Sequence, residues 1–207
     1  MTNILRRGYT DQINRHTAEN ICHAVDYAKY KNMPLNRYVV INFAVQRVLE
    51  PTTLFTSIRK KYRIWLKGAY RRMGQPALPP VYVYTHENPD GHPHVNWMVH
   101  VPPSLHAEFE RKLESWVRKV LGAARPFDIS NQAIDPFRDK RLTKYLIKGI
   151  DPAFIDYLHL QEVAMPQGRI FGRRATASPA ISRKARKDAG FVPRLHRHLW
   201  KQDRTAA

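Results

Sequence analysis

The sequence has a single cysteine, few acidic residues and no long apolar run. One cysteine, Cys22, cannot form an internal disulfide bond, which favours a protein of a reducing compartment such as the cytoplasm. No stretch of about 18 apolar residues is present, so the sequence predicts no transmembrane helix. The N-terminal residues also lack the apolar core of a signal peptide. We therefore expect a cytoplasmic protein that is not inserted in a membrane.

The scarcity of acidic residues leaves a large positive charge. The 207 residues include 35 Lys and Arg against 17 Asp and Glu, which gives a formal net charge of +18. A charge of this size favours a polyanionic partner, with nucleic acid first and an anionic membrane second. The length suits one domain with additions and is sufficient to bury a hydrophobic core.

A hairpin over Val81–Pro102 organises the rest of the sequence. Val81–Thr85 is rich in β-branched and aromatic residues, which is typical of a strand. Asn88–Gly91 reads NPDG, a strong turn sequence because Asn, Asp and Gly tolerate positive φ and Pro presets its own φ. His94–Val101 is then predicted to be the returning strand.

Metal-binding residue types gather at the turn end of this hairpin. Side chains alternate along a strand, so His92, His94 and Asn96 share one face, and Glu87 lies close to the turn. Imidazole and carboxylate groups together suit Mg, Mn, Zn or Fe. A solvated surface position is the simpler interpretation of any one of these histidines. The cluster beside a carboxylate favours a divalent-metal site.

The predicted elements follow the order strand, helix, strand, strand, helix, strand, helix. That order is the split β-α-β, ferredoxin-like arrangement with one added helix. We therefore predict an α+β fold in which an antiparallel sheet of four or five strands carries helices on one face, preceded by an N-terminal helix. Besides the hairpin, strands are expected at Arg37–Ala44 and Phe127–Ala133, and helices at Thr10–Lys31, Leu54–Met73, Leu105–Val120 and Asp139–Ile150.

Composition divides the chain into three segments. We predict an N-terminal helical segment over 1–34, a main domain over 35–166 and a basic C-terminal extension over 167–207. The extension contains one short helix between Ser178-Pro179 and Gly190, and it is expected to pack on the main domain or on nucleic acid.

Basic side chains form two groups that we predict to contact nucleic acid. Four lie on the polar face of the helix Leu54–Met73, although many charged helix faces are only solvated. The predicted contacts are Lys60, Arg63, Lys67 and Arg71 on that helix, and Lys144, Arg173, Arg174, Arg183 and Lys184 later in the chain.

Tyr145 and Lys148 lie three residues apart in the last predicted helix of the main domain and therefore point to the same side. A Tyr hydroxyl can attack a phosphodiester, and a neighbouring Lys can neutralise phosphate charge. On spacing alone, a half-buried packing role is the commoner interpretation of such a Tyr.

The chain resembles the HUH endonucleases, which include rolling-circle replication initiators, conjugative relaxases and related transposases. The resemblance rests on Glu87, on GHPHVN at Gly91–Asn96 and on YLIK at Tyr145–Lys148, in that order within about Arg37–Ile150. It makes the main domain an HUH-like palm and implies a metal-dependent nuclease with one catalytic Tyr. It further implies Mg²⁺ or Mn²⁺, a single-stranded DNA substrate and a 5′-phosphotyrosine intermediate. Such chemistry serves replication initiation or mobilisation of a plasmid, phage or integrative element.

One position departs from the family pattern G-x-P-H-x-H. Asn96 stands where the second His is expected, so either His92 or Asn96 completes the metal site, or nuclease activity has been lost. The alternative from another class is a non-catalytic module in which exposed Tyr82, Tyr84 or Trp97 stacks single-stranded bases. A basic structural protein of a nucleoprotein particle is a third interpretation.

Overall fold

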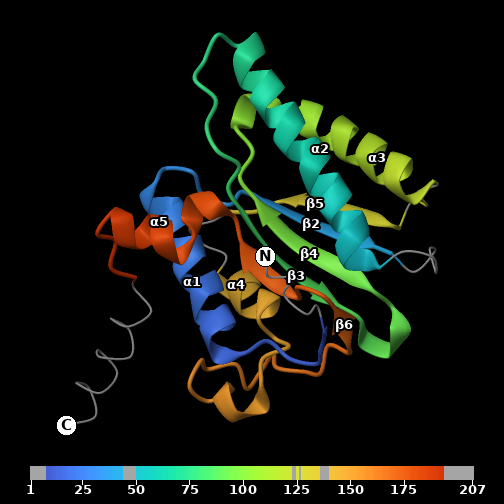
Figure 1. The fold of residues 1–207 in the computed structure, drawn as a ribbon, viewed down its shortest axis with the longest axis vertical. Coiled ribbons are helices and arrows are strands. Elements are labelled where there is room, and N and C mark those ends of the chain that lie inside the picture. The colour runs from blue at the N-terminus through green and yellow to red at the C-terminus, as the bar shows by residue number, and fades with distance from the viewer. Residues whose placement is uncertain (1–7, 44–49, 123–124, 126, 136–139, 194–207) are drawn as a thin grey trace, which may run out of the picture.

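A computed structural model describes residues 8–43, 50–122, 125, 127–135 and 140–193. Its centre is a five-stranded antiparallel sheet with the strand order β5-β2-β4-β3-β7 (Figure 1). The strands are β2 (Arg37–Asn42), β3 (Tyr82–Glu87), β4 (His94–Val99), β5 (Ile129–Ala133) and β7 (Ala175–Ala177). The fold is therefore α+β, as the sequence predicts.

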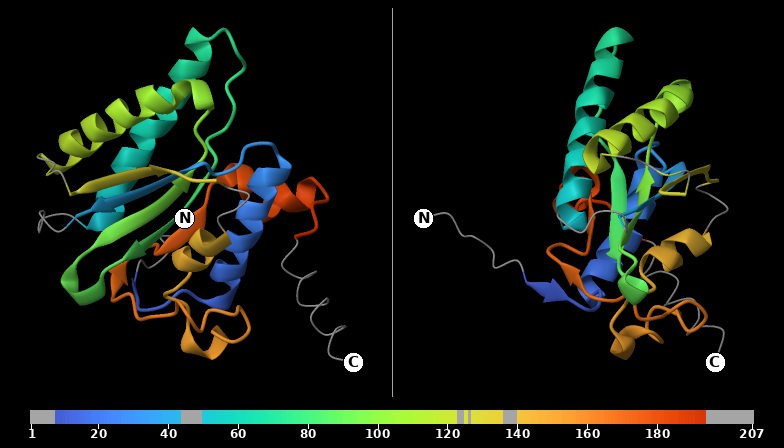
Figure 2. Two further views of the ribbon diagram at one scale, coloured as in Figure 1. Left: turned by 180° about the vertical axis from the view of Figure 1, so that it is seen from behind. Right: turned by 90° about the vertical axis from the view of Figure 1, so that its right-hand side faces the viewer.

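The first four strands of this sheet have the split β-α-β arrangement. Strands β2 and β3 both pair antiparallel with β4, so they run parallel to each other with β4 between them. Helix α2 (Pro51–Arg72) connects β2 to β3, and α3 (His106–Leu121) connects β4 to β5. Figure 2 shows these two helices on the same face of the sheet. The strand order and the position of the crossover helices agree with the prediction.

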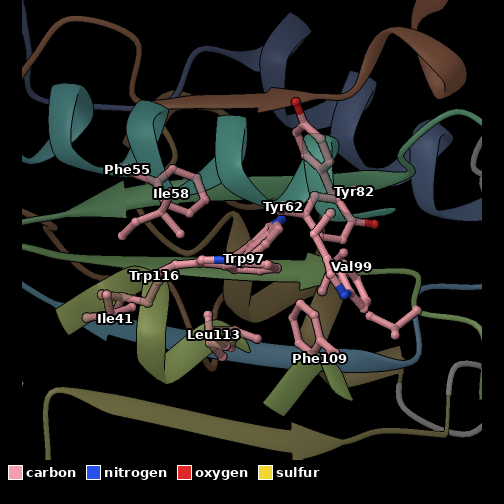
Figure 3. Close-up of a cluster of buried hydrophobic side chains, with 14 of the residues drawn as sticks. Ile41, Phe55, Ile58, Tyr62, Tyr82, Trp97, Val99, Phe109, Leu113 and Trp116 are labelled. Atoms are coloured by element: carbon pink, nitrogen blue, oxygen red, sulfur yellow. The ribbon is translucent and has the colours of Figure 1, made fainter. Parts of the chain in front are cut away.

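Aromatic side chains fill the layer between this helix pair and the sheet (Figure 3). The Trp97 ring has its centroid 5.4 Å from that of Phe55 and 5.2 Å from that of Tyr62, both in edge-on contact. Tyr82, Tyr84 and Trp97 are only 4%, 3% and 0% exposed. The alternative in which these three side chains stack bases on an open sheet is therefore wrong, because α2 and α3 cover that face.

The opposite face of the sheet is covered by α1 (Arg15–Tyr30) and α4 (Lys140–Leu146), with α5 (Arg183–Asp188) packed beside α1 (Figure 2). Helix α1 begins one turn later than predicted because the Asn14 side chain caps it, accepting a hydrogen bond from the Thr17 N–H at 2.8 Å. A second hydrophobic cluster lies beneath these helices and includes Ile21, Ala24, Val83, Met98, Leu146 and Ile181.

Two strand pairs in the terminal segments were not predicted. Strand β6 (Ile170–Phe171) pairs with β1 (Tyr9–Thr10), and β7 extends the main sheet by pairing with β3. These strands are two or three residues long, and β7 reads Ala-Thr-Ala, so neither carries an alternating pattern. The division into three segments remains a prediction, and the structure adds that the last segment contributes a strand to the central sheet.

Helix α4 ends earlier than the predicted helix Asp139–Ile150, whose first residue is outside the described residues. The chain turns at Ile147–Gly149, and Ile150 then forms a parallel bridge with Ile13. The Ile13 N–H donates to the Gly149 carbonyl at 2.8 Å. This tertiary pairing competes with the last helical turn and removes Lys148 from the helix. Among the residues that the structure describes, none belongs to a helix that is both long and apolar enough to cross a membrane.

Candidate active site

The hairpin places Glu87 directly opposite His94. The two residues are paired in the register of β3 and β4, on the face of the sheet that α1 and α4 cover. The turn between them contains Asp90 and Gly91, both at positive φ as the turn sequence predicts. Nε2 of His94 lies 2.9 Å from Oε2 of Glu87, and the Glu87 side chain is 2% exposed. The turn end of the hairpin thus holds a buried carboxylate in contact with an imidazole.

Lys148 approaches the same carboxylate from the turn after α4. Its Nζ lies 2.9 Å from Oε2 of Glu87, and its side chain is 5% exposed. Burying two charges is unfavourable unless they are closely paired, so the ion pair and the imidazole contact hold this carboxylate in place. Oε1 of Glu87 is also buried and has no hydrogen-bond partner.

Tyr145 completes this cluster of predicted residues. Nζ of Lys148 lies 3.4 Å from the centroid of the Tyr145 ring, a distance at which the ring face attracts the cation. The Tyr145 side chain is 40% exposed, so a bulky substrate can reach it. Although α4 ends before Lys148, the Lys148 N–H donates to the Tyr145 carbonyl at 3.3 Å, which keeps the two residues close together. Tyr145, Lys148, Glu87 and His94 therefore form one site from three segments of the chain.

Asn96 lies two residues after His94 on β4, on the same face of the sheet. Its Oδ1 accepts a hydrogen bond from the Tyr38 hydroxyl at 2.5 Å, while its buried Nδ2 has no partner. Burial raises the pKa of Tyr38, and the nearby Tyr145 and Glu87 add to this effect, so the hydroxyl stays protonated and able to donate. Sequence analysis missed Tyr38. Tyr38 lies two residues before Val40, which is paired with Asn96 in the register of β2 and β4, so Tyr38 and Asn96 share a face of the sheet. The contact therefore depends on the pairing of β2 with β4.

His92 lies at the mouth of the strand, as Pro93 suggests, because Pro is poorly tolerated inside a central strand. Its side chain is exposed, and its carbonyl accepts a hydrogen bond from Nδ1 of His94 at 3.0 Å. This bond orients the His94 ring and leaves Nε2 directed at Glu87. A ligating His commonly has such a support on its other nitrogen.

The donor set fits a hard divalent cation held by few protein ligands. Mg²⁺ is usually bound through one or two carboxylates together with water and substrate phosphate oxygens. Glu87 provides an unpartnered buried oxygen, and His94 provides an oriented nitrogen beside it. Among the described residues no group of three His, Cys, Asp or Glu side chains is placed to hold a metal ion, so Glu87, His92 and His94 do not form a three-ligand group.

The predicted nucleic-acid contacts come from three segments of the chain, which are α2, α4 and the C-terminal extension. Lys60, Arg63, Lys67 and Arg71 are exposed along α2, and Arg173, Arg183 and Lys184 are exposed in the C-terminal extension. Lys144 is exposed next to Tyr145, and its Nζ donates to the His159 carbonyl at 2.7 Å. Lys184 forms an ion pair of 2.7 Å with Asp188 in the same helix.

The burial of Arg174 contradicts the prediction that this residue contacts nucleic acid. Its side chain is 4% exposed, and its guanidinium is used within the protein. It donates to the carbonyl oxygens of Thr10 at 2.6 Å, His86 at 3.4 Å, Gln167 at 3.5 Å and also Gly168. The sequence does not separate Arg173 from Arg174, because the inward position of Arg174 depends on the tertiary contacts of its guanidinium.

The chain was compared with models of known protein families and with curated proteins. No family model matches it, and neither does any curated protein. The resemblance to the HUH endonucleases rests on the sequence motifs and stays a prediction.

Proposed function

We propose that this protein nicks single-stranded DNA and transfers the strand through a covalent bond to Tyr145. The observation that carries the proposal is the position of Lys148. Its ammonium group lies 3.4 Å from the Tyr145 ring centroid and 2.9 Å from the Glu87 carboxylate. A half-exposed Tyr beside a buried cation and a carboxylate–imidazole pair brings together groups that can support attack on a phosphodiester.

In the proposed reaction the Tyr145 hydroxyl oxygen attacks the scissile phosphorus. An oxygen–phosphorus bond forms to Tyr145, and the bond from phosphorus to the 3′ oxygen breaks. The products are a 5′-phosphotyrosine and a free 3′-hydroxyl. Tyr145 loses one proton in this step, and the 3′ oxygen gains one. The polarity of cleavage is the one that the family resemblance implies. The covalent bond keeps the phosphodiester energy, so religation needs no ATP.

The proposed enzyme binds Mg²⁺ or Mn²⁺. Glu87 and His94 would be the principal ligands of the ion, and Asn96 or His92 would be the third. When bound, the ion supplies polarisation of the scissile phosphate. Lys148 adds fixed positive charge near the Tyr145 ring, which favours an approaching phosphate. The His92 carbonyl holds the His94 ring in one orientation. The cytoplasm and the replication or mobilisation of a mobile element are the setting we propose.

Circular single-stranded DNA provides the first test, because one nick converts a circle into a linear molecule. We expect linearisation in Mn²⁺, none in EDTA, and no cutting of a linear duplex of the same sequence. A protein that binds the circle but never linearises it under these conditions would not be the enzyme proposed here.

A further inference from the structure

A large open groove lies between α2, the edge strand β7 and the β1–β6 pair. Its volume is about 1550 Å³, and its lining includes Thr52, Arg59 and Arg63 of α2, Tyr84 of β3, Thr10 of β1 and Arg173 between β6 and β7. We propose that this groove binds the backbone of the single DNA strand on one side of the nick. The assignment to DNA rests on the proposed function, and it adds a second contact surface away from Tyr145.

The charge of the groove is one-sided. Its walls contain three guanidinium groups, those of Arg59, Arg63 and Arg173, and its described lining has no carboxylate. Arg63 and Arg173 are exposed and belong to segments far apart in the sequence. Several Thr side chains add hydroxyl donors, and helix α2 begins at the groove with Glu50 as its N-cap and no acidic residue in its first turn. Phosphate oxygens are the ligands that such a surface recognises.

Arg59 lies between neutral side chains. It donates to the Tyr82 hydroxyl at 3.2 Å and to Oγ1 of Thr56 at 3.0 Å, and its guanidinium carbon lies 4.7 Å from the Tyr84 ring centroid. No carboxylate in the described part of the chain forms an ion pair with it, and its buried Nε has no hydrogen-bond partner. Its orientation is fixed while its charge remains uncompensated, which prepares it for an incoming anion.

Consecutive residues of one segment line the groove and a smaller hollow beside the residue that follows Lys148. Thr10 lines the groove, whereas Asp11 and Gln12 line a smaller hollow of about 320 Å³ together with Gly149, the residue after Lys148. The Asp11 carboxylate in this segment is paired with Arg169 at 3.2 Å.

The size of the groove favours a polymer over a small molecule. Small-molecule pockets usually measure about 300–1,000 Å³ and enclose most of the ligand, whereas this groove is larger and open. Tyr9 at its edge is 60% exposed and provides a ring face on which a base can stack.

The test compares two double variants that lose the same charge. Arg63→Gln with Arg173→Gln removes two exposed groove cations, and Arg111→Gln with Arg118→Gln removes two exposed cations of α3 outside the groove. Binding of fluorescent dT20 is measured in EDTA at several salt concentrations, so that no cleavage is needed. Circular dichroism verifies that both proteins are folded.

We expect the groove variant to lose about 1.4 from the log–log salt slope, at about 0.7 per phosphate contact on a single strand. If these contacts contribute nothing at 1 M salt, that change corresponds to about 25-fold weaker binding at 0.1 M salt. The control variant should bind like wild type. Equal losses in both variants, or competition by poly-glutamate as effective as that by unlabelled dT20, would overturn the proposal. Groove-dependent binding without any nicking would instead refute only the proposed function.

Discussion

The ammonium nitrogen of Lys148 lies 2.9 Å from Oε2 of Glu87, although the two side chains are only 5% and 2% exposed. This buried ion pair connects the turn after α4 to the end of β3. It places a cation beside Tyr145 and holds the carboxylate that faces His94. The geometry of the candidate site therefore depends on a pair that also stabilises the fold.

Removing one partner of this pair should be costly. We expect Lys148→Met to lower the free energy of unfolding by about 3–5 kcal/mol, because Glu87 is left buried without its cation. The double variant Lys148→Met with Glu87→Gln should recover part of that loss, since no unpaired charge remains. Urea unfolding of the three proteins measures the effect, with Lys67→Met as the control at an exposed position. Equal stability of Lys148→Met and wild type would show that the pair is not formed in solution.

The identity of the third metal ligand can be tested at two positions. Asn96 is 1% exposed on the face that carries His94, whereas His92 is exposed at the strand mouth. We expect Asn96→Ala to weaken Mn²⁺ binding and Mn²⁺-dependent nicking more than His92→Ala does, and Asn96→His to retain or increase both. Isothermal titration with Mn²⁺ gives affinities independently of cleavage. An inactive His92→Ala beside an active Asn96→Ala would instead assign the site to His92-Pro93-His94.

His86 makes stability depend on pH. Burial, with added repulsion from Arg59 and Arg174, lowers its pKa to about 3. The unfolded chain has a His pKa near 6.5, so between these values the unfolded state binds one more proton and acid favours unfolding. We expect His86→Leu to remove a slope of up to about 1.4 kcal/mol per pH unit below about pH 6.5. The exposed His92→Gln should keep the wild-type slope in urea unfolding measured from pH 7 to pH 4, and an unchanged slope in His86→Leu would contradict this account.

Arg173 and Arg174 should differ sharply despite being neighbours. Arg174→Met leaves several buried carbonyl oxygens without their donor, at about 1–3 kcal/mol for each unsatisfied group, so it should destabilise the fold. Arg173→Met should leave stability unchanged and weaken DNA binding, because that side chain is exposed in the groove. Thermal unfolding and dT20 binding separate the two effects, and the reverse pattern would show that Arg173, and not Arg174, is held inside the fold.

The sequence predicts much of the architecture because its strands and helices carry clear periodicity. The hairpin, its turn and the two crossover helices follow from alternation, turn chemistry and apolar stripes. The grouping of Glu87 and His94 follows from one strand pair, and that of Tyr145 and Lys148 from a spacing of three residues. Their chemical roles remain proposals.

Other features depend on tertiary contacts that no local pattern reveals. Tyr38 reaches Asn96 only because β2 lies beside β4. The burial of Arg174 depends on β7 pairing with β3, and the early end of α4 depends on the bridge from Ile13 to Ile150. Each of these residues looks ordinary in sequence, so periodicity and charge counting could not identify it.

The most direct test of the central claim asks whether Tyr145 becomes covalently attached to DNA. Wild type, Tyr145→Phe and Tyr157→Phe are each incubated with Mn²⁺ and a library of single-stranded oligonucleotides, and the products are run on a denaturing gel. Each oligonucleotide carries its label at the 3′ end and is truncated at the 5′ end. Peptide mapping by mass spectrometry locates any adduct. We predict a labelled protein band for wild type and Tyr157→Phe, with the phosphate on Tyr145, and no band for Tyr145→Phe, which should still bind the library with nearly unchanged affinity. An adduct that persists in Tyr145→Phe, or a wild type that never forms one on any strand it nicks, would contradict the account.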